Sequence, residues 1–361
     1  MGYIDNLLRG RKVEWKTLGE VAKIRNGKDY KHLSVGSIPV YGSGGVMRYV
    51  DTPIYDQPTV LIPRKGSLNN LFYVDSPFWN VDTIFYTEIN RERIRPKFLY
   101  HYLSTLHLEG LNLAGGVPSL TQKTLNALPI PLPPLDVQEE IARILDRFTA
   151  LEAALKAELE ARQKQYEYYR DRLLTFDKTR TDVEWKALGE VAEYEQPSKY
   201  LVHSTKYNDS FPTPVLTAGK SFILGYTDES SGIYRASEAP IILFDDFTTA
   251  SQWVDFNFKV KSSATKIITS RDEGVVLLKY IYYWLNTLPS ECVEGDHKRR
   301  WISTFTIKKI PLPPLAEQDR IVRILDKFTA LTTSLTAGLP REIALRRRQY
   351  EYYREQLLSF E

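Results

Sequence analysis

Apolar residues recur at helical spacing in two stretches of the chain. Over residues 137 to 174 they follow one another at intervals of three, four or seven, which predicts a long amphipathic helix. At 1.5 Å per residue it is about 57 Å long. Residues 317 to 361 keep the same stripe, with a glycine and a proline that predict a kink near residues 338 to 340. Two such helices in one chain favour an antiparallel coiled coil.

Short apolar or β-branched runs bounded by Gly, Pro, Asn and Asp fill the remaining regions and predict strands. The expected strands are residues 38 to 41, 59 to 62, 71 to 74, 83 to 87, 214 to 217, 239 to 244 and 266 to 269. Residues 97 to 108 and 275 to 288 are rich in Tyr and Leu and predict helices. We therefore expect an α+β protein: two mixed α/β domains separated by the two long helices.

The chain contains an internal sequence repeat, and this repeat determines the architecture. Residues 13 to 22 and 183 to 192 are identical at nine of ten positions. Two blocks that open with IPLPPL share 17 of 26 residues, and two blocks around QYEYYR share 10 of 16. Residues 23 to 129 and 193 to 309, which lie between these blocks, show no similarity that we recognise. A fixed frame around unlike inserts predicts an internal pseudo-two-fold repeat.

This repeat divides the chain into four expected segments. They are a first domain with an N-terminal helix tail at residues 1 to 136, a first spacer helix at 137 to 176, a second domain at 177 to 316 and a second, kinked spacer helix at 317 to 361.

Composition limits the class of protein but not its function. The 361 residues carry 48 basic and 45 acidic side chains, so the net charge of +3 does not by itself indicate nucleic-acid binding. The apolar runs are far shorter than a membrane span, and a lone Cys292 excludes an internal disulfide. We expect a cytoplasmic protein without membrane contact.

Tests for catalytic motifs are negative. The GKS at residues 219 to 221 has Pro214 where a phosphate-binding loop needs glycine, and the YGSGG string is not followed by a methyltransferase motif. Asp245 and Asp246 follow an apolar run, where paired acids are typical of turns. The five histidines are scattered and predict no zinc site. We expect no catalytic and no metal residues.

The duplicated frame of EWKxLGEVA, IPLPPL, RILD, FTAL and QYEYYR around unlike inserts resembles the DNA specificity (S) subunit of type I restriction-modification enzymes, over essentially the whole chain. The resemblance implies that each insert is a target recognition domain for half of a bipartite, asymmetric site in double-stranded DNA. It implies two methyltransferase subunits that use S-adenosylmethionine and two motor-nuclease subunits that use ATP and Mg²⁺. This chain, from a bacterium or archaeon, then holds no cofactor and is not catalytic.

Under this resemblance, DNA contacts come from polar side chains on exposed loops of the inserts. In the first insert the predicted residues are Lys28, Tyr30, Lys31, Tyr41, Ser43, Arg48, Arg64, Lys65, Ser67, Asn69 and Asn70. In the second they are Lys220, Ser221, Thr248, Thr249, Lys261, Ser262, Ser263, Lys266, Lys298, Arg299 and Arg300.

Identity between the two copies should mark helix pairing or partner docking. The predicted residues are Gln138, Phe148, Tyr166, Tyr169, Gln318, Phe328, Tyr350 and Tyr353. An alternative reading is a non-catalytic scaffold of two β-rich modules on a coiled coil that binds protein or glycan. A third interpretation is a stand-alone nuclease. Salt-sensitive DNA binding separates the first reading from the scaffold, and metal-dependent cutting by the isolated chain identifies the nuclease.

Overall fold

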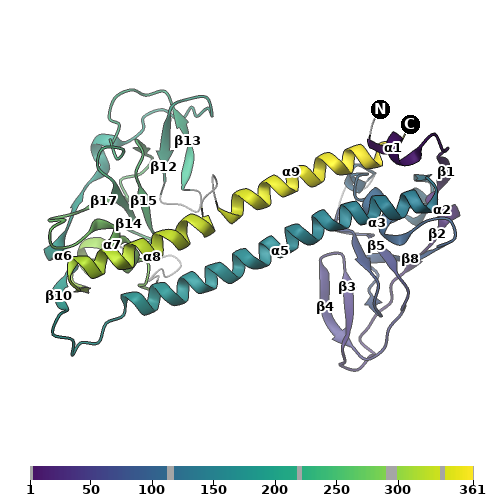
Figure 1. The fold of residues 1–361 in the computed structure, drawn as a ribbon, viewed down its shortest axis with the longest axis horizontal. Helices are drawn as coiled ribbons and strands as arrows, with labels where there is room; N and C mark the ends of the chain where they lie inside the picture. The colour runs from purple at the N-terminus through teal and green to yellow at the C-terminus, as the bar shows by residue number, and fades with distance from the viewer. Residues whose placement is uncertain (1–2, 112–117, 218–221, 290–298, 334–337, 361) are drawn as a thin grey trace. The chain divides into compact units, whose positions relative to one another are not determined.

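The computed structural model describes residues 3 to 111, 118 to 217, 222 to 289, 299 to 333 and 338 to 360 (Figure 1). The chain folds into two compact units. The first unit combines Met1–Lys156 with Glu342–Glu361, and the second unit is Ala157–Arg341. Each unit therefore contains one insert and parts of two long helices.

Three long helices carry the apolar stripe: α5 (Leu135–Leu174), α8 (Leu315–Thr333) and α9 (Leu339–Leu358). The expected second helix is thus two helices. α8 ends before the residues predicted to kink it, and α9 starts at the Leu-Pro step that follows Gly338. Residues 334 to 337, which include part of that break, lie outside the described residues.

The long helices pair antiparallel within each unit. In the first unit the end of α9 meets the start of α5, because Leu357 packs in one core with Val137 and Ile141. In the second unit the end of α5 meets the start of α8, where Leu174 packs with Ile321. The prediction of paired antiparallel helices is confirmed.

The first insert forms two small sheets. The four-stranded sheet has the order β2-β8-β5-β6, and the three-stranded sheet has the order β4-β3-β7. Their bounds are β2 (Ala22–Asn26), β3 (Ile38–Gly42), β4 (Gly45–Val50), β5 (Thr59–Pro63), β6 (Phe72–Val74), β7 (Trp79–Asn80) and β8 (Ile84–Ile89). The short helices are α1 (Tyr3–Leu8), α2 (Leu18–Val21), α3 (Pro96–Leu103), a 3-10 turn at Leu108–Leu111 and α4 (Gln122–Asn126).

The second insert has the same order of strands. Its four-stranded sheet is β11-β17-β14-β15 and its three-stranded sheet is β13-β12-β16. The bounds are β11 (Ala192–Glu195), β12 (Thr213–Leu216), β13 (Ile223–Thr227), β14 (Ile241–Asp245), β15 (Ser251–Val254), β16 (Lys259–Val260) and β17 (Thr265–Ser270). The helices are α6 (Leu188–Val191), a 3-10 turn at Pro197–Tyr200, α7 (Leu278–Leu285) and a π-helical turn at Trp301–Phe305.

The repeated blocks pair with each other at the base of each insert. The EWK segment β1 (Glu14–Thr17) lies antiparallel to the IPL segment β9 (Pro129–Leu132). β10 (Glu184–Ala187) and β18 (Lys309–Leu312) form the same ribbon in the same register. An insert of any sequence thus begins and ends at one fixed ribbon, and its last strand leads directly into a long helix.

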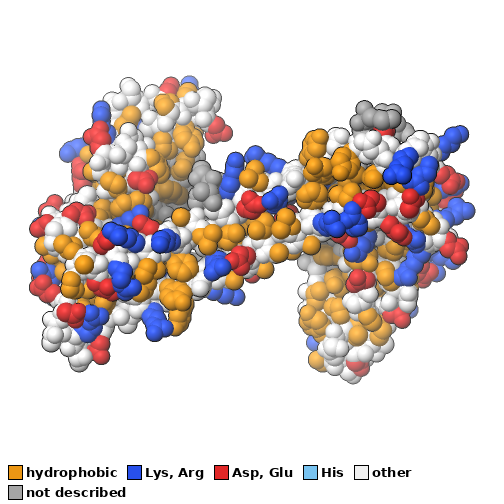
Figure 2. Space-filling model, in the orientation of Figure 1, with side chains coloured by type: hydrophobic (Ala, Val, Ile, Leu, Met, Phe, Trp, Pro, Cys, Tyr) orange, Lys and Arg blue, Asp and Glu red, His pale blue; other side chains and the backbone are white. Residues whose placement is uncertain are grey.

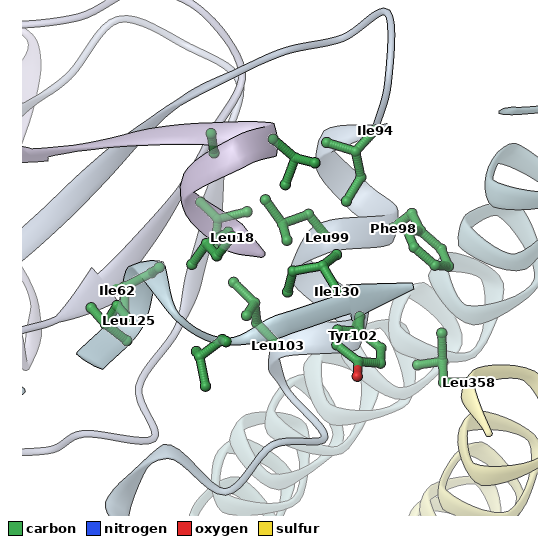
Figure 3. Packing of buried hydrophobic residues seen from close by; sticks show 14 of the residues in the cluster. Leu18, Ile62, Ile94, Phe98, Leu99, Tyr102, Leu103, Leu125, Ile130 and Leu358 are labelled. Atoms are coloured by element: carbon green, nitrogen blue, oxygen red, sulfur yellow. The ribbon is translucent and has the colours of Figure 1, made fainter. Parts of the chain in front are cut away.

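Burial explains why these sequences form these elements. All five residues of β5 are buried, as are all five of β14, which accounts for their continuous apolar or small side chains. Figure 3 shows the first core: Leu18 of the frame, Leu99 of α3 and Ile130 of β9 converge, and each is fully buried. Frame and insert therefore share one core.

The seven predicted strands are all present, each displaced by at most two residues at either end. The two predicted helices are shorter than expected. α3 stops at Leu103, where the Ser104 and Thr105 hydroxyls donate to the carbonyls of Tyr100 and Tyr102, both at 2.7 Å. Side chains that bond back to carbonyls in this way favour a helix end.

Candidate nucleic-acid interface

In the first unit, two of the predicted loops come together. The tip of the β3–β4 hairpin carries Ser43, whose carbonyl accepts a hydrogen bond from the Asn70 amide at 3.2 Å. The turn after β5 passes beside it at Gly66, which has φ +83°, a conformation that glycine adopts without strain. Tyr41, Ser43 and residues 64 to 70 therefore form one surface region, which we call the first loop cluster.

The cations of this cluster extend from the end of β5. The Arg64 guanidinium lies 5.8 Å from the centre of the Phe85 ring and is half-buried. Lys65 is exposed, with its ammonium 3.8 Å from a carboxylate oxygen of Asp82. Exposed pairs of this kind contribute little to stability, so the Lys65 side chain is available to an anion. Both side chains can present donors to a ligand in front of the turn.

The amides of the cluster already have partners. Asn69 donates to the Glu109 carboxylate, and Asn70 donates to Ser43 as described. Ser67 and both asparagines are exposed. A base that bonds to Asn69 or Asn70 has to replace these contacts, so Arg64 and Lys65 are the better placed donors.

A second group lies on another part of the same unit. The Arg48 guanidinium is 5.4 Å from the centre of the Tyr30 ring, so Arg48 belongs with Lys28, Tyr30 and Lys31 and not with the hairpin tip. The Trp79 indole holds this segment by donating to the Lys28 carbonyl at 2.9 Å. Lys28, Lys31 and Arg48 are exposed, as phosphate contacts require.

In the second unit, Asp245 shapes the turn after β14. Its carboxylate accepts from the backbone amides of Phe247 at 2.8 Å and Thr248 at 3.2 Å, and Thr249 adopts φ +62°. The acid is thus a turn former, as expected, and the turn presents Thr248 and Thr249.

Another predicted loop follows β16. The Lys261 ammonium lies 5.9 Å from the centre of the Tyr207 ring, and the Lys261 amide donates to the Leu216 carbonyl at the end of β12. Ser262 and Ser263 continue this loop, and the Ser262 hydroxyl accepts from the Ala264 amide at 3.1 Å. Arg299 is exposed and Arg300 is half-buried. Lys220, Ser221 and Lys298 lie outside the described residues.

Lys266 requires a correction. Its side chain is only 1% exposed, and its ammonium pairs with Asp246 at 3.1 Å beneath the surface. The sequence predicts Lys266 among the exposed polar side chains that contact DNA. Because β17 is a central strand with Asp246 beside it, the side chain points into the interior, and we remove Lys266 from the candidate DNA contacts.

Gln138 and Gln318 also require correction, because both are fully buried and their amides are used within their own unit. Gln138 accepts from the Arg95 amide at 2.8 Å and donates to the carbonyls of Arg93 and Pro133. Gln318 makes the same three bonds to Leu277, Val275 and Pro313. These glutamines join each long helix to the insert helix; they neither pair the long helices nor face a partner.

The aromatic residues predicted at the helix pair do meet across it. The rings of Phe148 and Tyr353 stack with centroids 5.3 Å apart in the first unit, and those of Phe328 and Tyr169 stack at 5.7 Å in the second. Tyr166 lies 6.4 Å from the Phe328 ring. Burial raises the pKa of Tyr166 and of its counterpart Tyr350, which is consistent with their position between elements.

One pair of functional residues escaped the sequence analysis: the aspartates of the two RILD blocks. Asp146 accepts from Lys97 at 2.6 Å and is 2.8 Å from the His101 ring, both on α3. Asp326 meets Lys279 at 3.0 Å and accepts from the Tyr283 hydroxyl at 2.5 Å, both on α7. The identity of RILD in both copies was the available signal.

Hydrogen bonds from α3 determine the charge state of Asp146. Burial alone raises the pKa of Asp146, but hydrogen bonds from His101 and Lys97 outweigh it and leave the pKa below its ordinary value of 3.8. Asp146 is therefore charged at neutral pH, and with Gln138 it orients the first insert on its helix.

The described residues contain no group of three or more His, Cys, Asp or Glu that could hold a metal ion. Among the same residues we find no helix with the length and apolar character to cross a membrane. Positive and negative side chains are interspersed on the face shown in Figure 2.

The model of the type I restriction modification DNA specificity domain matches residues 11–161 and 181–345. The specificity subunit of the Escherichia coli type I enzyme EcoR124I/EcoR124II is 63% identical over 186 residues, which is 50% of this chain and 45% of that protein. The Haemophilus influenzae type I specificity subunit S.HindORF215P is 34% identical over 383 aligned residues, covering 99% of this chain and 98% of that one.

Solved structures agree on the fold. The S subunit from M. genitalium superposes with a TM-score of 0.69 at 14% identity and covers 97% of each chain. A chain from a structure of type I restriction-modification complex assembly and conformational transition has a TM-score of 0.52 at 17% identity and covers 96% of this chain. Together with the duplicated family model, these likenesses show that the chain belongs to the type I restriction-modification DNA specificity subunits, the non-catalytic subunits that give such systems their DNA specificity.

Proposed function

We propose that each insert reads one half of a bipartite, asymmetric DNA site through the loops at the ends of its central strands. The observation that carries this proposal is the contrast between frame and inserts. Both inserts have one topology and stand on ribbons of the same register, but the loops that follow β5 and β14 have unrelated sequences. The ribbon, the buried glutamine and the RILD aspartate attach each insert to its helix, and we call these contacts the mount. A repeated mount with unlike loops is suited to two different half-sites.

Within the first unit, we assign the bases to the first loop cluster and the phosphates to Lys28, Lys31 and Arg48. Arg64 or Lys65 donates to guanine O6 and N7, and an asparagine of the cluster suits adenine. Tyr30 supports Arg48 through the ring contact described above.

Within the second unit, we assign the contacts to the turn after β14, the loop after β16 and Arg299 with Arg300. Thr248, Thr249, Ser262 and Ser263 are short donors and acceptors suited to base edges, while Lys261 and the arginines suit phosphates or guanine. Lys220, Ser221 and Lys298 remain predictions from the sequence.

The duplicated frame supports two equivalent docking sites for one partner, and we propose two methyltransferase subunits. Tyr168 and Tyr352 occupy the same place in the two QYEYYR blocks and are 58% and 59% exposed. Leu151 and Leu331, which end the two FTAL blocks, are 41% and 38% exposed. Identical exposed apolar side chains in both units are not required for helix pairing, and aromatic anchors are enriched at protein interfaces.

The remaining partners and cofactors follow from membership of the family. We propose that S-adenosylmethionine is bound by the methyltransferase subunits, and that ATP and Mg²⁺ are used by two motor-nuclease subunits. The site of action is double-stranded DNA in the cytoplasm. The spacer helices set the distance between half-sites at about one duplex turn, ~34 Å.

The test is to co-express the chain with the methyltransferase subunit of its system and map N6-methyladenine across the host genome. We expect a split, asymmetric motif that disappears without this chain. Replacing residues 23 to 129 by the insert of another specificity subunit should change one half of the motif. A stable complex that binds S-adenosylmethionine but methylates no such motif contradicts the proposal.

A further inference from the structure

An ion pair in the second unit stands out because both partners are buried. Asp246 follows β14 and is 2% exposed at its side chain, and Lys266 of β17 is 1% exposed. Removing two charges from water is expensive, and a buried ion pair is weak evidence for stability. Stability alone therefore does not account for this pair.

Asp246 holds a segment that is distant in sequence. One carboxylate oxygen accepts from the backbone amides of Arg300 at 2.9 Å and Trp301 at 2.6 Å. The Arg300 amide also reaches the Asp246 carbonyl at 3.0 Å. The other carboxylate oxygen faces the Lys266 ammonium at 3.1 Å. We call residues 299 to 301 the anchored segment.

The anchored segment is further fixed by an aromatic cluster below it. The Trp301 ring is 1% exposed and lies 5.0 Å from the ring of Phe244, the residue two positions before Asp246. Phe305 lies 4.8 Å from the same phenylalanine. Trp301 therefore points inward, while Arg299 remains exposed on the segment that Asp246 holds.

The equivalent positions of the first unit do not hold a buried ion pair. The registers show that Arg64 occupies the place of Asp246 and Phe85 that of Lys266, because Ile62 faces Phe85 as Phe244 faces Lys266. There backbone bonds join the returning segment to the turn: Leu120 donates to the Arg64 carbonyl at 2.9 Å and Gly66 to the Pro118 carbonyl at 3.1 Å.

From this difference we infer that Asp246 is a positioning residue for DNA readout: its carboxylate fixes Arg299 and Arg300 beside the Thr248–Thr249 turn, and Lys266 neutralises it. The inference rests on the proposed function of the inserts. In the first unit the equivalent side chain, Arg64, contacts DNA directly. In the second unit the side chain at this position is Asp246, which holds the anchored segment. Arg299 and Arg300 of that segment supply the basic groups.

Two double variants separate the anchor from the buried charge. Asp246→Leu with Lys266→Met removes both charges and the acceptor. Asp246→Asn with Lys266→Met also removes both charges but keeps an oxygen for the amides of Arg300 and Trp301. Removing both partners together avoids leaving an unpaired buried charge.

The matched control is a second ion pair in the same unit, between the buried Lys259 and the half-buried Glu229, at 2.9 Å. Its carboxylate accepts from the amides of His203 and Ser204, so it holds a different segment. Glu229→Gln with Lys259→Met should leave the motif unchanged.

All variants are assayed as complexes with the methyltransferase subunit, by mapping the methylated motif and by measuring affinity for a duplex that carries it. Asp246→Leu with Lys266→Met should relax the half-site that Arg64→Ala leaves intact and weaken binding of the cognate duplex about tenfold. Asp246→Asn with Lys266→Met should retain the wild-type motif. Thermal unfolding of each complex reports whether the variants are folded.

Hydrogen exchange supplies a readout that does not depend on a variant folding. In the wild-type complex the amides of Arg300 and Trp301 should be protected, and in the Leu/Met variant they should exchange at least about tenfold faster while β14 stays protected. Unprotected wild-type amides, a folded Leu/Met variant with both half-sites intact, or a folded Asn/Met variant with a relaxed half-site overturns the inference. Absence of any bipartite motif with the wild-type chain instead refutes the proposed function.

Discussion

The two inserts show how one topology is reached from unlike sequences with different interior chemistry. In the first unit the four-stranded sheet is crossed by a buried hydroxyl pair, Thr59 with Thr87 at 3.1 Å. In the second unit the buried polar groups include two lysines, Lys259 and Lys266, each paired with a carboxylate. Insert interiors therefore vary almost as freely as their loops.

What does not vary is the attachment of each insert to its helix. The ribbon of EWK with IPL, the buried glutamine and the RILD aspartate recur in both units with the same partners by position. The lesson is that identity between the copies marks the mount as well as the partner surface. An insert with the right ends can be exchanged without redesign of the helices.

The largest effect should come from breaking this mount. Gln318→Ala removes the hydrogen-bond partner of the Leu277 amide and of the carbonyls of Val275 and Pro313, which should lower the free energy of unfolding by about 3 kcal/mol. Gln138→Ala should do the same in the first unit. Urea denaturation, followed by hydrogen exchange to locate the loss, measures both.

Glu140→Gln is the control for these variants, since Glu140 forms an exposed pair with Arg143 on the same helix as Gln138. It should change stability by less than about 0.5 kcal/mol. Equal effects of Gln138→Ala and Glu140→Gln contradict the role assigned to the mount.

A second prediction addresses the interior that differs between units. Trp79 of the first unit takes the place of Lys259, so only the second unit depends on Glu229. Glu229→Gln leaves Lys259 buried and unpaired. We expect a loss of about 2 kcal/mol at pH 7, below the ~3–5 kcal/mol of a fully buried pair, because Glu229 is still 18% exposed.

The pH dependence of this loss has a defined sign. Backbone bonds from Ser204 and the Lys259 contact lower the pKa of Glu229 from 4.5 to about 2. The stabilisation is then complete above pH 4.5 and disappears as the pH falls toward 2. Urea unfolding of wild type and variant between pH 7 and 3 measures the difference, which should shrink below pH 4.5. A difference independent of pH excludes Glu229 as its source.

Sequence reasoning reached the strands and long helices because their signals are local. It missed the burial of Lys266, because that depends on the pairing of β17 with β14 and on an acid 20 positions away. It assigned Gln138 to helix pairing or docking because duplication does not tell an internal contact from an external one. Glu14 and Leu132 pair in the ribbon but lie at opposite ends of the first insert in the sequence. Local sequence patterns therefore do not reveal this pairing.

The third prediction tests the loops that differ. Arg64→Ala removes a guanidinium that has no counterpart after β14, where Asp246 stands. It should weaken binding of the cognate duplex by about 1–3 kcal/mol and relax one half of the methylated motif only. Fluorescence anisotropy with wild-type and single-base-changed duplexes measures this, and Lys23→Gln on β2, outside both groups of proposed contacts, serves as the control for loss of one cation. Uniform weakening on all duplexes contradicts base readout by Arg64.

The smallest effect should come from the phosphate group of the first unit. Lys31→Gln removes one exposed cation beside Tyr30 without disturbing the core. Binding should weaken similarly on every duplex, by about 0.5–1 kcal/mol, and the slope of log affinity against log salt should decrease by about 1. Titrations at several salt concentrations measure the slope, with Lys23→Gln on the neighbouring strand β2 as a control for loss of charge alone. If both variants change the slope equally, the effect is one of net charge; a change confined to Lys31 locates the DNA backbone at the Arg48–Tyr30 group and separates it from the bases read at Arg64.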